Sequence, residues 1–152
     1  MRSRLVSLSL LFGCLGAAVV VPSGLASERA SHGSRTPQTL AGVWSSEDGD
    51  ASLIYGFTRQ GIYEFRGVLV QARVGGTFEY KVVARGTASA NGNVLVLHPS
   101  RRVAYVHDPG HHDRKRKLST ARERYHWSVS GIGAQSQLVL VDHTGNAVTY
   151  TR

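Results

Sequence analysis

Three histidines and two carboxylates gather within one short segment in the second half of the chain. His107, His111 and His112 offer imidazole nitrogens, and Asp108 and Asp113 offer carboxylate oxygens. Zinc, copper and nickel all accept such ligands. The spacing matches no established metal-binding pattern, however, and a Pro-Gly pair inside the segment predicts a turn. We therefore expect a solvated polar loop that holds no metal or cofactor, and the three histidines are the candidate ligands if a metal does bind.

A run of four cations follows the histidines and is the strongest polar feature of the sequence. It comprises Arg114, Lys115, Arg116 and Lys117, with further arginines around it at Arg101, Arg102, Arg122 and Arg124. Clustered cations bind phosphate-rich polymers such as teichoic acid or nucleic acid, and also anionic lipid. Tyr105 and Tyr125 could add stacking to nucleobases. The alternative is a surface loop that only keeps the protein soluble.

Aromatic side chains form a third candidate site. Tyr63, Phe65 and Trp127 could line a pocket for a small hydrophobic ligand. Other rings expected inside the protein are Tyr55, Phe57, Phe78 and Tyr80. The alternative is that all of these rings simply pack as core, because burial of each ring stabilises a fold with or without a ligand.

No catalytic signature is present, so we expect that the protein is not an enzyme. The sequence has neither a G-x-S-x-G turn nor an H-E-x-x-H helix. Glu64 and Glu79 would suit a glycosidase-type pair if a hairpin placed them face to face. Arg66 and Lys81 are equally available as their partners on an outer face.

Before and after the polar segment of histidines and cations, short apolar segments alternate with Gly, Asn, Asp and Ser turns. No helical period interrupts the alternation, which indicates antiparallel strands. The expected strands are 39–44, 52–58, 62–74, 77–89, 94–97, 122–129, 137–141 and 147–151. The remaining segment, 100–121, is expected to be irregular apart from a short apolar patch at 103–106.

About eight strands with one apolar face each must hide that face in a closed barrel or a sandwich. Near-sequential hairpins favour an up-and-down barrel, which also removes exposed strand edges. The predicted fold is therefore all-β: an antiparallel up-and-down barrel over residues 39–152, after an N-terminal signal peptide.

The first 26 residues have the three parts of a secretory signal peptide. Arg2 and Arg4 form its basic start, 5–21 its apolar run, and 23–26 the small residues at the cleavage position. A retained membrane anchor is the alternative. We expect cleavage after residue 26, a flexible polar linker over 27–38, a secreted or extracytoplasmic location, and no stable membrane insertion afterwards.

The single cysteine, Cys14, lies inside this leader. A lipoprotein signal at Cys14 is an alternative to ordinary cleavage. After cleavage the chain has no thiol, which excludes disulfides and thiolate metal sites. Without Arg2 and Arg4 the mature chain has 16 basic and 10 acidic residues, a net charge of about +6.

Several short motifs resemble small exported bacterial lipocalin-like domains. They are Gly42-Val43-Trp44, the stretches 94–99 and 124–127, and the closing segment 138–152. The resemblance implies a β-barrel and assigns no activity. It also implies that Trp44 packs across one end of the barrel against an arginine from a late strand. Arg124 is the candidate for that arginine, and the pair would be a structural plug.

We therefore expect an exported, lipocalin-like binding or interaction module. Its partner would be a small hydrophobic ligand or another protein at the barrel mouth. The alternative is docking of the basic loop to an anionic envelope polymer or nucleic acid, and a small barrel enzyme is the third possibility.

Overall fold

The computed structural model describes residues 36–152. The expected signal peptide, and most of the expected linker over 27–38, lie outside the described residues. Within residues 36–152, no helix combines the length and hydropathy that a membrane span requires.

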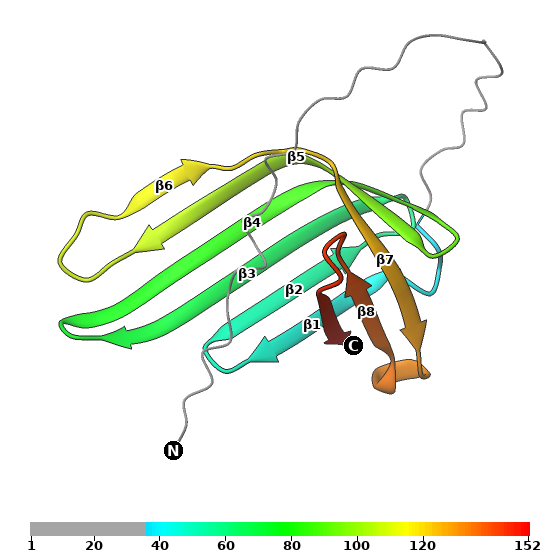
Figure 1. Ribbon diagram of the computed structural model, residues 1–152, viewed down its shortest axis with the longest axis horizontal. Helices are drawn as coiled ribbons and strands as arrows, with labels where there is room; N and C mark the ends of the chain where they lie inside the picture. The colour runs from blue at the N-terminus through cyan, green and yellow to red at the C-terminus, as the bar shows by residue number, and fades with distance from the viewer. Residues whose placement is uncertain (1–35) are drawn as a thin grey trace, which may run out of the picture. The chain divides into compact units, whose positions relative to one another are not determined.

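The described part of the chain consists almost entirely of strands (Figure 1). They are β1 (Gly42–Asp48), β2 (Ala51–Phe57), β3 (Ile62–Arg73), β4 (Gly76–Asn91), β5 (Val94–His107), β6 (Arg114–Lys117), β7 (Glu123–Ser130), β8 (Gln137–Val141) and β9 (Ala147–Thr151). Between β7 and β8 lies a 3-10 turn, η2 (Gly133–Gln135).

Eight of these strands form a closed antiparallel barrel. Hydrogen-bonded neighbours follow the order β4-β3-β2-β1-β9-β8-β7-β5, and β4 also pairs with β5, which closes the ring. The predicted fold class is confirmed, and the barrel is compatible with a lipocalin-like architecture. In Figure 1 the β3–β4 and β5–β6 hairpins run side by side and project together beyond the other strands.

The core follows from the alternation of side chains along the strands, because successive side chains point to opposite faces. Tyr55 and Phe57 are buried and Leu53 packs against them, so the predicted shared face of β2 is confirmed. Along β7, every second residue is exposed, beginning with Arg124. The core also contains Leu40, Trp44, Tyr63, Phe65, Val82, Ala88, Leu95, Leu97, Ala104, Leu138, Leu140 and Tyr150.

The expectation of an irregular segment over 100–121 is wrong. β5 does not stop at His98-Pro99 but continues to His107, and β6 follows within the same segment. The register of β4 against β5 shifts between Arg85 and Gly86, where a bulge accommodates Pro99, which has no backbone N–H to donate. Gly86 is required at this point, because a Cβ there would overlap the carbonyl oxygen of His98.

β5 forks between two partners. Val94–Leu97 pairs with β7, whereas Val103–Val106 pairs with β6. β6 pairs with no other strand of the described chain, so its second edge is open. The expected beginning of the first strand is also wrong: Thr39–Ala41 is not part of β1, and Leu40 N–H donates to the Pro37 carbonyl at 3.0 Å in a turn.

Candidate functional site

Cations from four neighbouring strands point to one outer face of the projecting hairpins. Residues that pair directly across antiparallel strands share a face, and Arg85 pairs with Arg101 while Lys81 pairs with Tyr105, which pairs in turn with Lys115. We call this surface the basic face. It consists of Arg66 of β3, Lys81 and Arg85 of β4, Arg101 of β5, and Lys115 and Lys117 of β6.

Few negative charges offset these cations. Strands β3 to β6 contain only two carboxylates, Glu64 and Glu79. The register places Glu64 opposite Arg85 and Glu79 opposite Val70. The two carboxylates therefore do not face each other, and the glycosidase-type pair considered from the sequence is wrong.

Tyr105 lies in the middle of the basic face between two ammonium groups. Lys81 Nζ lies 5.3 Å and Lys115 Nζ 5.5 Å from the centroid of its ring. Such positions are attractive for a cation over an aromatic face. The other tyrosine expected beside the cations, Tyr125, is on the inward face of β7, where its hydroxyl donates to Glu123 Oε2 at 3.1 Å.

The run of four cations, 114–117, forms β6, and its side chains point to two different faces. All four side chains are exposed, but they alternate between the two faces of β6. Lys115 and Lys117 join the basic face. Arg114 and Arg116 point to the opposite face, since they pair with Val106 and Ala104, and Ala104 belongs to the core.

The flanking arginines have separate positions. Arg101 belongs to the basic face. Arg102 of β5 points inward and forms an ion pair with Glu123 of β7. This ion pair lies at the fork where β5 changes its partner from β7 to β6. Arg122 and Arg124 are exposed before and within β7. The predicted cation run thus contributes Lys115 and Lys117 to the basic face, whereas nothing in the sequence groups them with Arg66, Lys81 and Arg85, which resemble ordinary surface charges on strands.

A groove of about 470 Å³ opens where the basic face meets β1 and β2. One row of paired residues crosses it, from Val43 through Gly56, Glu64 and Arg85 to Arg101. Gly56 leaves the gap, because a Cβ there would meet no atom within 4 Å. The groove is further lined by Ile54, Phe65, Arg66, Val83 and Ala84.

Inside the barrel, a polar cluster surrounds the Arg102–Glu123 pair. The Tyr125 hydroxyl donates to Glu123, and the Nε of Arg102 is buried without a hydrogen-bond partner among the described residues. Burial raises the pKa of Tyr55 and Tyr63 well above the usual value, and the charge of Glu123 adds to the effect. These phenols therefore remain neutral in the folded protein.

The three residues expected to line a hydrophobic pocket lie in different surroundings. Tyr63 and Phe65 are 2% and 8% exposed. Their ring centroids lie 6.4 and 4.7 Å from that of Tyr55, so both are part of the packed core. Trp127 is partly buried, and its Nε1 donates to the Gly92 carbonyl at 3.1 Å. A ligand pocket formed by these three side chains stays a prediction.

The predicted plug has a different partner. Trp44 is fully buried, as expected of the plug residue, but the guanidinium over its ring belongs to Arg152, 4.3 Å from the ring centroid. Arg124 is exposed on β7, so its assignment as the partner is wrong. Arg152 directly follows β9, outside every predicted strand, so the strand pattern did not predict its contact with Trp44.

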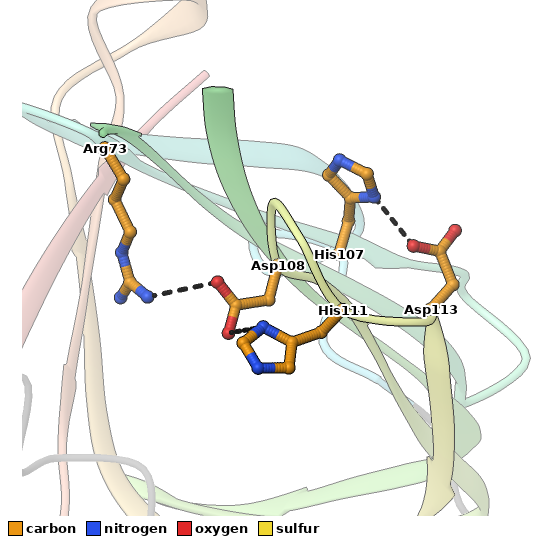
Figure 2. Close-up of polar contacts among 5 residues, drawn as sticks. All are labelled: Arg73, His107, Asp108, His111 and Asp113. Atoms are coloured by element: carbon orange, nitrogen blue, oxygen red, sulfur yellow. Dashed lines mark hydrogen bonds and ion pairs between the residues drawn. The ribbon is translucent and has the colours of Figure 1, made fainter. Parts of the chain in front are cut away.

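Two separate histidine–aspartate contacts lie at the tips of the projecting hairpins (Figure 2). His107 Nδ1 lies 2.7 Å from Asp113 Oδ1, whereas His111 Nδ1 lies 3.5 Å from Asp108 Oδ2. Arg73, at the end of β3, forms an ion pair with Asp108, with 3.4 Å between Arg73 Nη1 and Asp108 Oδ1. Across residues 36–152, no three potential ligands converge into a metal site, and His112 is exposed.

No family model matches the sequence, and neither a curated protein nor a solved structure is similar enough to match it. The site must therefore be interpreted from its own chemistry.

Proposed function

We propose that this protein is a binding module that docks a phosphate-rich polymer on the basic face. The observation that carries the proposal is the collection of six outward cations on four adjacent strands that contain only two carboxylates. Neutralising several phosphates with such a surface releases the condensed counterions of the polymer, which favours binding.

The form of the surface favours a flexible, extended polymer. Five of the six cations are exposed, and Lys81 is half-buried beside Tyr105. By register, they spread over the outer side of β3 to β6. A flexible chain can follow such an open sheet, and Tyr105 offers a flat ring within it.

We further infer that the barrel is lipocalin-like and is exported by the leader over 1–26. Support comes from the closed ring of strands and from Trp44, buried in the first strand under an arginine that follows the last strand. Lipocalins have a flanking helix, whereas residues 36–152 contain only the 3-10 turn η2. An exported protein of this charge would meet teichoic acid or free nucleic acid at the envelope.

The test compares two variants of the same strand that remove the same charge. Lys115→Ser with Lys117→Ser alters the basic face, and Arg114→Ser with Arg116→Ser alters the opposite face. Binding of labelled polyphosphate and of a labelled single-stranded oligonucleotide is measured by fluorescence anisotropy as salt rises.

We expect the lysine variant to reduce the steepness of log Kd against log salt by about 1.4, since each neutralised phosphate of a single strand contributes about 0.7. The arginine variant should change it less. Binding that ignores salt contradicts docking of a polyanion, and equal losses in the two variants contradict its placement on the basic face.

A further inference from the structure

We propose that the groove beside Gly56 receives one base of a single-stranded nucleic acid, which makes nucleic acid the polymer that the basic face binds. This inference rests on the proposed function and adds the identity of the partner.

The floor of the groove suits a flat ring. Val43, Ile54 and Val83 supply apolar side chains around the gap at Gly56. Val43 is 63% exposed, so this apolar surface is open to solvent. The volume of about 470 Å³ falls within the range of small-molecule sites, and a base can enter it while its backbone remains on the surface.

Three arginines lie at the rim of the groove. Within residues 36–152, Arg66, Arg85 and Arg101 form no ion pair, whereas Arg73 and Arg102 do. Arg85 and Arg101 pair directly across β4 and β5, an arrangement of like charges that is unfavourable by itself. A phosphate between the two guanidinium groups would remove this repulsion and accept hydrogen bonds from both.

Glu64 decides which kind of phosphate polymer fits. Its carboxylate lies in the same row, between Gly56 and Arg85. A bare polyphosphate or a lipid phosphate would be repelled there. A base with an amino group, such as cytosine, can instead donate a hydrogen bond to the carboxylate. The combination of apolar floor, acceptor and cations therefore matches a nucleotide rather than a phosphate alone.

The experiment fills the groove and leaves every cation of the basic face in place. Gly56→Leu is suitable, because a Cβ at this position meets no neighbour and the backbone has no positive φ. Thr149→Leu, exposed on β9, is the matched control. Kd values for labelled (dC)15, labelled (dT)15 and labelled polyphosphate of equal phosphate number are measured at one salt concentration, after urea denaturation has shown that both variants are fully folded under the binding conditions.

We expect Gly56→Leu to weaken binding of (dC)15 about tenfold, as loss of one stacked base does, and to leave polyphosphate binding and the Thr149→Leu control unchanged. Wild-type protein should bind (dC)15 more tightly than (dT)15, and Glu64→Gln should narrow that difference.

Equal effects of Gly56→Leu on (dC)15 and polyphosphate, or no effect on either, overturn the base site while docking of a polyanion stands. Equal binding of (dC)15 and (dT)15 by the wild type overturns the role of Glu64. If none of the three polymers binds with salt dependence, the proposed function itself fails.

Discussion

The guanidinium of Arg152 lies over the indole ring of Trp44, with its Cζ 4.3 Å from the ring centroid. The same group donates from Nη2 to the Ala41 carbonyl at 2.6 Å, and Trp44 Nε1 donates to the Leu40 carbonyl at 2.8 Å. These contacts lie where β1 and β9 share a single ladder pair, Ser45 with Thr151. Side chains thus reinforce the part of the barrel where the backbone ladder is shortest.

Replacing Arg152 should therefore weaken the fold. We expect Arg152→Ala to lower the free energy of unfolding by about 1–2 kcal/mol, because the cation–π contact and the hydrogen bond to Ala41 are both lost. Arg124→Ala removes an equal charge from an exposed position and should change stability by less than about 0.5 kcal/mol. Urea denaturation of the two variants measures the difference, and equal losses would mean that Arg152 has no special role.

Stability should fall steeply in alkali. Burial raises the pKa of Tyr55, Tyr63, Tyr125 and Tyr150 above the ordinary value. In the unfolded chain these phenols ionise near pH 10, so between that pH and their higher folded pKa the folded state binds more protons. These tyrosines therefore leave the free energy of unfolding unchanged below about pH 10 and lower it above that pH, by about 1.4 kcal/mol per pH unit for each tyrosine.

Urea denaturation from pH 8 to 12, together with phenolate absorbance, checks this prediction. Tyr150→Phe should reduce the fall in the free energy of unfolding above pH 10 by the contribution of one tyrosine, because burial alone raises the pKa of Tyr150. Ionisation of all the tyrosines near pH 10 in a protein that retains native circular dichroism would contradict it.

The inward ion pair should behave as a coupled unit. In the folded protein, Arg102 and Glu123 have side chains only 18% and 22% exposed, so removing one partner leaves the other poorly solvated. We expect Glu123→Leu and Arg102→Met each to lose about 2 kcal/mol of stability, and the double variant to lose clearly less than the sum. A double-mutant cycle in urea measures the coupling, and additive losses would show that the two groups act independently.

Two glycines should respond in opposite ways to the same added methyl group. Gly86→Ala places a Cβ on the His98 carbonyl oxygen, so β4 or β5 must shift, and we expect a loss of about 3 kcal/mol or more. Gly56→Ala meets nothing within 4 Å and should gain up to about 1 kcal/mol, because the unfolded chain loses conformational freedom. Urea midpoints of the two variants test this contrast, and a tolerated Gly86→Ala would contradict the close approach at the bulge.

Some elements could be predicted because their signal is local. The last two strands have the bounds expected from the sequence, Gln137–Val141 and Ala147–Thr151, since apolar alternation ends at a clear turn in each case. β6 could not be predicted in this way. Arg114–Lys117 contains no apolar residue, and these residues form a strand only because β5 provides a hydrogen-bonding edge.

The candidate site likewise has features that the sequence predicts and features that depend on the tertiary structure. The sequence alone determined the all-β class, the excess of positive charge and the position of the cation run, because period and composition are properties of neighbouring residues. The tertiary structure decided that only Lys115 and Lys117 of that run share a face with Arg66, Arg85 and Arg101. It also decided that Arg152 covers Trp44. These relationships depend on the register between distant strands, which the backbone ladder and the closure of the core set together.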